Sequence, residues 1–359
     1  APPRAAAVLP AAAAPAPLVG SAMTADSSVA TRPADVLGLV HAMAAAGALE
    51  SRLLSAAAAS LTAGASGPES VARQEATASP GLVVAGKAPT GTFTDSGAPG
   101  IMVEQGDLCI LWKPPAWSVA VSSGEGEDLQ DEDWGSTSSK KRAMRPKGRS
   151  LHVAPGPGEG GRLLQSWVQE TLGQRHAIAL DPVAAFGLVH RLDRDTSGPL
   201  LFAKTYPGYF WALLQFAALR VRKTYICLCN GWLPPAPKLL DSPLRTFRAP
   251  GGELRSEVHR LGRRARTEVC EVVHLISPEG ETCSLVEVRL GTGRLHQIRC
   301  HLAAEGHALV GDGAYGRGAA RRWCARIFLH ASHLGLAAPS GPLAARAPLP
   351  PDLRAALAA

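Results

Sequence analysis

The sequence predicts an α+β fold in which helices flank a mixed, largely antiparallel sheet. Residues 223–230 alternate with the strand period, so that every second side chain would face the same side. Residues 266–276 and 282–290 are two further strand-like runs separated by a short turn, which favours an antiparallel pair. Amphipathic helical stripes lie around these runs, at 162–172, 209–221 and 294–305.

The first hundred residues differ in kind from the rest, because Ala, Pro, Gly, Ser and Thr dominate there. The Ala-rich stretch 1–30 is compatible with an organellar targeting segment, although its amphipathic Arg pattern is thin. Apolar residues recur at helical spacing within 33–63, which predicts a helical hairpin that cannot bury its own apolar face. Residues 64–100 have the composition of a linker. We therefore expect a low-complexity extension over 1–100 and a folded domain over 101–359.

The folded domain begins with a strand at 107–113, which Pro114 and Pro115 end. Residues 122–150 are first acidic and then basic, and they contain few core-forming side chains. We therefore expect a disordered surface insertion there. Two later segments complete the element order, a Pro-rich excursion at 234–250 and a last strand at 327–336.

Composition limits the class of protein. The formal net charge of +7 over 359 residues suits a protein that meets phosphates, and equally a generic basic enzyme. The 7 cysteines are an odd number without a CxxC pair, so neither a zinc site nor a disulfide framework is indicated. No apolar run approaches the ~18 residues of a membrane span, so we expect no membrane partner.

The densest group of polar side chains lies between two short apolar runs, 186–189 and 199–203. The pattern predicts strand, loop and strand. The loop contains His190, Arg191, Asp193, Arg194, Asp195, Thr196 and Ser197. A structural turn does not need so many reactive and charged groups, so the loop indicates a site for a polar, anionic ligand.

This loop, His190-Arg191-Leu192-Asp193-x-x-Thr196-Ser197-Gly198, resembles the signature loop of the RluA-type RNA pseudouridine synthases. Three further blocks resemble that family in the same order: 108–117, Arg222-Lys223-Thr224-Tyr225, and Gly291-Thr292-Gly293-Arg294-Leu295-His296-Gln297-Ile298-Arg299 with its continuation to Asp312. Four ordered blocks over roughly 105–355 make the resemblance specific. It implies a pseudouridine synthase-like fold and a catalytic domain over 101–359.

Pseudouridine formation requires that the N1–C1′ bond of uridine breaks, the base turns, and C5 joins C1′. A carboxylate can attack the sugar or abstract the 2′ proton. The resemblance assigns this role to Asp193, whereas an Asp in a loop is more commonly a turn-capping residue. Asp195 is the competing carboxylate, and the two together would suit a glycosidase-like hydrolase.

The resemblance gives Asp193 two catalytic companions. A nucleophilic carboxylate stays ionised while partly desolvated when a cation lies nearby, and Arg299 is implied as that partner. Its alternative role is a surface helix charge. Tyr225 matches the family's base-stacking tyrosine, where an aromatic face contributes ~1–3 kcal/mol per stacked base. Its alternative role is an ordinary core tyrosine.

The remaining implied contacts are with substrate. They are His190, Arg191, Leu192, Thr196, Arg294, His296, Gln297 and Ile298. Arg191 would enter the RNA stack or hold a phosphate, and Leu192 and Ile298 would form apolar walls. His190, His296 and His301 share no ligand spacing with a carboxylate or Cys, so we expect them to make hydrogen bonds. No metal and no cofactor are expected.

The function predicted from the sequence is a cofactor-independent isomerase acting on uridines of structured RNA, either rRNA or tRNA. The alternatives are a catalytically silent RNA-binding relative that acts as a chaperone, and a hydrolase that uses Asp193 with Asp195. RNA is the expected partner, and we expect a monomer. The Ala-rich N-terminus permits a mitochondrion or plastid as well as the cytoplasm.

Overall fold

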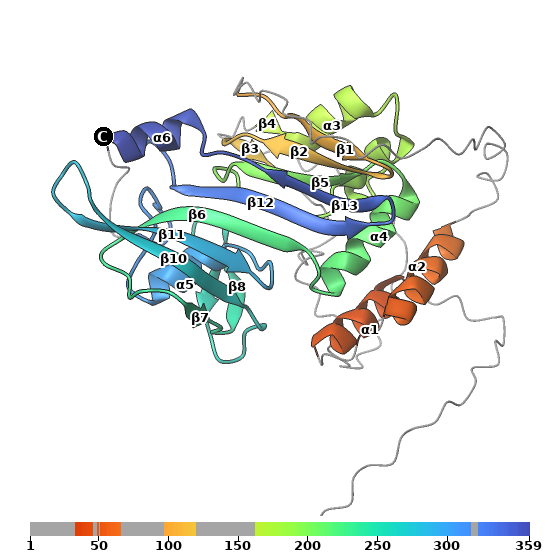
Figure 1. Cartoon of the computed structure of the whole chain (residues 1–359), viewed down its shortest axis with the longest axis horizontal. Coiled ribbons are helices and arrows are strands. Elements are labelled where there is room, and N and C mark those ends of the chain that lie inside the picture. Colours follow the sequence, from red (N-terminus) through yellow and green to blue (C-terminus); the bar gives the residue numbers. More distant parts are fainter. Residues whose placement is uncertain (1–32, 46–48, 50, 66–96, 120–161, 317–321) are drawn as a thin grey trace, which may run out of the picture. The chain divides into compact units, whose positions relative to one another are not determined.

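The centre of the fold is a six-stranded antiparallel sheet (Figure 1). This computed structural model describes residues 33–45, 49, 51–65, 97–119, 162–316 and 322–359. The strands are ordered β13 (Gly341–Arg346), β12 (Leu329–Ala338), β6 (Arg222–Asn230), β11 (Thr282–Leu290), β10 (Thr267–Ile276) and β7 (Lys238–Leu240). β6 pairs with β11 on one side and β12 on the other. The side chains that β6 carries therefore stand on a rigid support.

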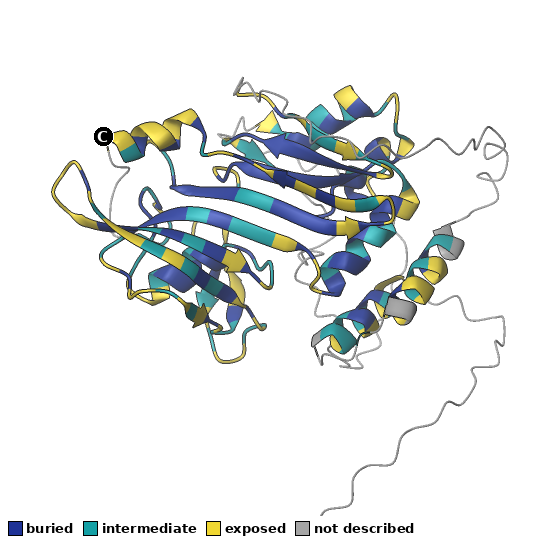
Figure 2. Cartoon of the chain, in the orientation of Figure 1, coloured by how far each residue is buried: buried dark blue, intermediate teal, exposed yellow. Residues whose placement is uncertain are grey.

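A second, three-stranded sheet carries the central loop of the sequence. It consists of β1 (Gly100–Gln105), β2 (Leu108–Lys113) and β5 (Gly198–Ala203), all antiparallel. Every residue of β2 and β5 is buried (Figure 2). A bridge between Ser197 and His330 joins the entrance of β5 to β12 of the larger sheet. The loop before β5 therefore lies where the two sheets meet.

Helices and short strands complete the element order. They are α3 (Leu164–Leu172), α4 (Tyr206–Ala217), α5 (Gln297–Ala304), α6 (Pro351–Ala358), the short parallel pair β3 (Trp117–Ser118) and β4 (Arg162–Leu163), and the hairpin β8 (Leu244–Arg248) and β9 (Leu254–Val258). The predicted α+β class with a mixed, largely antiparallel sheet is confirmed. None of the described helices is long and apolar enough to span a membrane.

The N-terminal segment contributes two helices, α1 (Pro33–Ala45) and α2 (Ser51–Ala65). Their buried residues Leu37, Val40, Leu54 and Leu61 form one cluster with Leu214, Ala217 and Ala218 at α4. His41 Nδ1 also lies 3.0 Å from the carbonyl oxygen of Ala217. The apolar face that the hairpin cannot bury by itself is thus buried against α4. The expected targeting segment at 1–30, most of the expected linker at 64–100, and the expected insertion at 122–150 lie outside the described residues.

The predicted elements need correction in three respects: a strand that is wrong, the ends of helices, and strands that were missed. The strand expected at 186–189 is wrong, because the positive φ angles of Ala185 (49°), Phe186 (57°) and Gly187 (76°) reverse the chain there. Only Leu188 makes a strand-like bridge, to Phe202. Those residues are apolar because the turn packs into the core, and an apolar run alone cannot distinguish a buried turn from a strand.

The other two corrections concern element ends and missed strands. The helix expected to begin at Arg294 begins at Gln297, because His296 has a left-handed backbone (φ 50°). α4 begins earlier than predicted, since the Thr205 side chain accepts a hydrogen bond from the Gly208 N–H as an N-cap. The Pro-rich excursion at 234–250 contains two strands, β7 and β8. β7 pairs with β10 and β8 pairs with β9, and both partners lie outside that stretch.

Gly198 gives a direct test of the junction between the loop and β12. Its φ is +136°, and a Cβ there would lie 2.3 Å from the carbonyl oxygen of Ala331. We expect Gly198→Ala to lower the free energy of unfolding by about 2–4 kcal/mol in urea denaturation. Gly100→Ala is the matched control, because a Cβ at Gly100 would meet nothing within 4 Å. Equal stability of the two variants would contradict the close approach.

Candidate active site

A cavity in the region where the loop before β5, β6 and the start of α5 meet contains every site residue predicted from the sequence. Its lining includes Asp193, Tyr225, Arg299, His190, Arg191, Leu192, Thr196, Arg294, His296, Gln297 and Ile298. Residues of α4 and His41 of α1 form another part of the wall. Three of the four sequence blocks, up to about a hundred residues apart, therefore converge at this cavity, and the first block, 108–117, does not line it.

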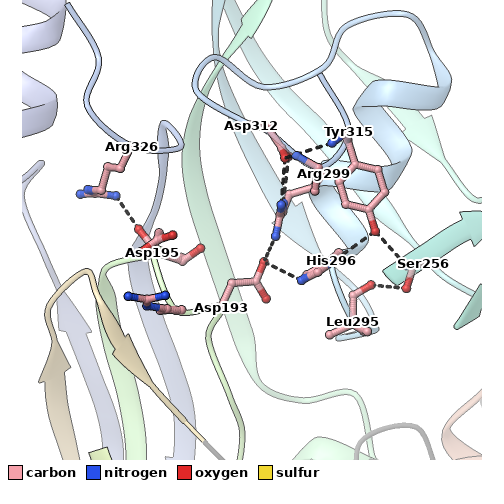
Figure 3. A network of polar contacts seen from close by, with 12 residues as sticks. Asp193, Asp195, Ser256, Leu295, His296, Arg299, Asp312, Tyr315 and Arg326 are labelled. Carbon is pink, nitrogen blue, oxygen red and sulfur yellow. Dashed lines mark hydrogen bonds and ion pairs between the residues drawn. The ribbon is translucent and has the colours of Figure 1, made fainter. Parts of the chain in front are cut away.

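Asp193 and Arg299 form an ion pair in this cavity, as Figure 3 shows. Arg299 Nη1 lies 3.3 Å from Asp193 Oδ2, and the two side chains are only 14% and 20% exposed, respectively. Burial by itself would lower the pKa of Arg299. The hydrogen bonds and charges of Asp312 and Asp193 outweigh burial and raise that pKa above its usual range. Arg299 is therefore a fixed cation next to Asp193 and not a surface helix charge.

A second carboxylate, Asp312, holds Arg299 from the other side. Arg299 Nε and Nη2 donate to Asp312 Oδ2 and Oδ1, each at 2.8 Å, and the Asp312 side chain is fully buried. Burial acts to raise the pKa of Asp312, but Arg299 and the backbone N–H groups of Ala314 and Tyr315 lower it overall. The guanidinium also lies over the ring of Tyr315, 5.2 Å from its centroid. These contacts leave Nη1 as the group directed at Asp193.

His296 approaches Asp193 from a different direction. Its Nε2 lies 3.9 Å from Asp193 Oδ2, and its Nδ1 lies 3.1 Å from the Tyr315 hydroxyl. That hydroxyl accepts the backbone N–H of Ser256 at 2.8 Å, which leaves its proton for His296 Nδ1. The proton of a neutral His296 then resides on Nε2, facing Asp193 (Figure 3). Burial lowers the pKa of His296 more than the Asp193 charge raises it, which favours this neutral form.

Tyr225 lies on β6 and is buried at the cavity wall. Burial, and secondarily the Asp193 charge, raises the pKa of its phenol above the usual range. The hydroxyl therefore stays protonated at neutral pH. Tyr225 thus presents an apolar ring and a neutral donor to the space next to Asp193.

Lys113, the last residue of β2, holds the loop that carries Asp193. The Lys113 side chain is fully buried, and its Nζ donates to the carbonyl oxygens of Pro114 (3.0 Å), Arg194 (2.9 Å) and Thr196 (2.7 Å). Burial lowers the pKa of Lys113 to about 7. The negative charges of Asp193 and Asp195 act to raise this pKa but do not outweigh burial. Such a contact fixes the backbone on the C-terminal side of Asp193.

Asp195 lies on the outside of the loop. It is exposed and does not line the cavity, and its carbonyl oxygen accepts from Arg326 Nη1 at 2.8 Å. Arg326 also donates to Ser197 Oγ at 3.1 Å and pairs with Asp352. The paired-carboxylate arrangement that a glycosidase-like hydrolase requires is therefore not formed by Asp193 and Asp195.

Several residues that were predicted to contact substrate form hydrogen bonds within the protein. His190 Nε2 accepts the Leu201 N–H at 2.9 Å, and burial lowers the pKa of His190 to about 3. Gln297 Oε1 accepts from Thr292 Oγ1 and from the Arg294 N–H, and its amide nitrogen donates to the Arg266 carbonyl. His301 bonds Thr267 and Ser242. His190 and Gln297 thus shape the cavity wall. No group of three or more His, Cys, Asp or Glu that could hold a metal ion occurs in the described part of the chain.

Five residues that contact the site or its loop were not predicted to have a role: Asp312, Tyr315, Lys113, Ser256 and Arg326. Asp312 ends the Gly-Asp pair of the last sequence block, and Lys113 opens the Lys-Pro turn of the first. Both residues therefore lie in recognised sequence blocks, but the blocks did not indicate what their side chains contact. Ser256 lies in the hairpin that the sequence analysis missed, where no motif identifies it.

The chain is similar in sequence to known RNA pseudouridine synthases. Residues 147–304 match the family model of the RNA pseudouridylate synthases. An uncharacterized RNA pseudouridine synthase of Chloroflexus aurantiacus is 40% identical over 59% of this chain and 64% of its own length. Ribosomal large subunit pseudouridine synthase D of Zymomonas mobilis is 33% identical over 54% of this chain and 61% of its own length. This chain therefore matches less than two thirds of the length of these relatives.

A solved structure, human RNA pseudouridylate synthase domain containing 1, has 20% identity over 73% of this chain and 89% of its own, with a TM-score of 0.49. The family model and these curated relatives agree in what they resemble, RNA pseudouridine synthases. The similarity to pseudouridine synthase D of the ribosomal large subunit is of the RluA type that the sequence motifs indicated.

Lys113 provides a test of how the loop is held. Lys113→Met would leave three carbonyl oxygens without this donor, and we expect a loss of about 2–3 kcal/mol in the free energy of unfolding. Because the pKa of folded Lys113 is lowered to about 7, the unfolded chain binds more protons between pH 7 and about 10. Wild-type stability therefore gains with pH over this window, and the deficit of the variant should widen from pH 7 to pH 9. A deficit that does not change with pH would show that the pKa of Lys113 is not lowered.

The control is Lys238→Met, which removes a partly exposed ion pair with Glu305. This substitution should lower the free energy of unfolding by at most about 1 kcal/mol.

Proposed function

We propose that this protein is an RNA pseudouridine synthase that isomerises uridines of structured RNA, either rRNA or tRNA. The observation that carries the proposal is the Asp193 carboxylate, paired with buried Arg299 in a cavity that Tyr225 also lines. The similarity to RNA pseudouridine synthases over 147–304, and to pseudouridine synthase D of Zymomonas mobilis, supports it.

Asp193 is the residue that would act on the sugar. Its carboxylate attacks C1′, or abstracts the 2′ proton to give a glycal, as the N1–C1′ bond breaks. The uracil anion turns within the cavity, and C5 bonds to C1′ as the Asp193–C1′ bond breaks; on the glycal route the proton taken by Asp193 returns to C2′ instead. The C5 proton is then lost to solvent, and N1 takes up a proton from solvent. The reaction is an isomerisation, so its atoms and electrons balance without an external reactant. The residues present can supply both an ionised carboxylate and the walls that retain the base.

The groups around Asp193 would divide the remaining tasks. Arg299 places a positive charge next to the carboxylate in a partly desolvated site. Tyr225 offers a ring against which the flipped uracil can stack. Arg191 lies at the cavity wall next to Asp193 and would hold the RNA backbone or fill the space that the uridine leaves.

A basic surface near the cavity supports RNA as the partner. Exposed arginines in and after the β8–β9 hairpin are Arg245, Arg248, Arg260, Arg264 and Arg266. The hairpin is tied to the site, because Ser256 Oγ donates to the Leu295 carbonyl at 2.6 Å. Arg294 Nε, from the cavity lining, donates to the Arg264 carbonyl at 3.1 Å. Phosphates of a bound RNA would meet this surface while the target uridine enters the cavity.

The first experiment is tritium release from total RNA labelled with 5-³H-uridine. We expect wild-type protein to release tritium and Asp193→Asn to be slower by at least about 1000-fold while still binding RNA. Free uracil among the products would identify a hydrolase instead. RNA binding without tritium release from any RNA would contradict the synthase proposal and favour a catalytically inactive RNA-binding protein.

A second activity prediction concerns Asp312. Asp312→Asn keeps the shape but removes the charge that orients Arg299, so we expect kcat to fall about 10–100-fold. KM for RNA should stay close to wild type, because Asp312 does not line the cavity. The same substitution in an Arg299→Lys background should cost much less, since Asp312 acts through Arg299. Equal losses in both backgrounds would show an independent role. Glu268→Gln, at an exposed pair with Arg289, is the control.

A further inference from the structure

Lys223 is a partly buried cation in the same cavity without an assigned role. It lies on β6, two residues before Tyr225, so both side chains project from the same face of the strand. Its Nζ lies 3.4 Å from the Thr292 carbonyl oxygen and 5.5 Å from the centroid of the Phe216 ring. Thr292 and Phe216 both line the cavity, as Lys223 itself does. The ammonium group is therefore in the cavity wall.

The described residues supply no carboxylate to pair with this ammonium. The ion pairs of the described chain do not include Lys223, and its hydrogen bond to Thr292 is long. Burial, and secondarily the charge of nearby Arg294, lowers the pKa of Lys223 to about 8. The Lys223 charge in turn helps lower the pKa of His190. A buried charge is costly unless something pairs with it, so the missing counterion indicates an anionic ligand.

We propose that Lys223 binds a phosphate group next to the target uridine, an inference that rests on the proposed function. Phosphate is the group of RNA that carries a full negative charge, and a cation without a counterion gains most from it. Two residues along a strand place Lys223 about 7 Å from Tyr225. A phosphate at Lys223 would thus flank a base placed at Tyr225. Arg294, in the same cavity, adds positive charge on that side.

The proposal gives Lys223 a role in substrate binding and none in the chemical step. Lys223→Met should raise KM for RNA about tenfold or more and leave kcat within about threefold. The slope of log KM against log salt concentration should decrease by about one unit, because one phosphate contact is lost. Lys223→Arg, which keeps the charge, should retain the wild-type slope. Arg222→Met is the matched control, because Arg222 is exposed, precedes Lys223 on the same strand and does not line the cavity.

A direct binding measurement keeps the proposal testable if Lys223→Met is poorly folded. We expect wild-type protein to bind uridine 3′,5′-bisphosphate more tightly than uridine by calorimetry, and Lys223→Gln to reduce this preference at least about tenfold. A preference that is the same in wild type and variant would overturn the proposal. A variant with normal KM and salt slope but lower kcat would also overturn it, by placing Lys223 at the uracil.

These outcomes can be separated from failure of the proposed function. If wild-type protein releases tritium and Lys223→Met behaves like wild type, only the phosphate contact is wrong. If wild-type protein releases no tritium but binds the bisphosphate through Lys223, only the isomerase activity is wrong.

Discussion

The site depends on one arrangement of charge, a guanidinium held between two carboxylates. Arg299 contacts Asp193 through Nη1 and Asp312 through Nε and Nη2. Desolvating any one of these ions alone would be costly, and the three together share that cost. Two carboxylates and one guanidinium leave one negative charge. Asp312 and Arg299 already satisfy each other in a bidentate pair, so the Asp193 carboxylate keeps a single contact with Arg299 and stays available for the sugar.

The fold brings these charges together from elements that are far apart in the sequence. Asp193 comes from the loop before β5, Arg299 from α5, and Asp312 from the turn that follows α5. The loop is fixed because Lys113 binds its carbonyl groups and because Ser197 bridges to β12. The distance between the two carboxylates is therefore set by the packing of both sheets and not by local sequence.

Strong periodicity made part of this architecture predictable. β10 and β11 were predicted to within one residue, since long strands with one buried face alternate clearly. The turn at Ala185 to Gly187 was missed, because apolar residues at positive φ look like a strand in the sequence. The convergence of the site residues followed from ordered motifs. The role of Asp312 did not, because a bidentate contact across 13 positions depends on how α5 ends and how the chain returns.

Two lysines, one fully buried and one partly buried, show how the surroundings decide the role of a charge. Lys113 and Lys223 both have pKa values lowered by burial, to about 7 and about 8. Lys113 donates to three carbonyl oxygens, so its hydrogen-bonding capacity is used by the protein itself. Lys223 has one long hydrogen bond and a ring, at the edge of a cavity. The protein therefore uses the hydrogen-bonding capacity of the Lys113 ammonium fully and that of the Lys223 ammonium only in part. An ammonium with unused donors in a cavity is suited to bind an anion from outside.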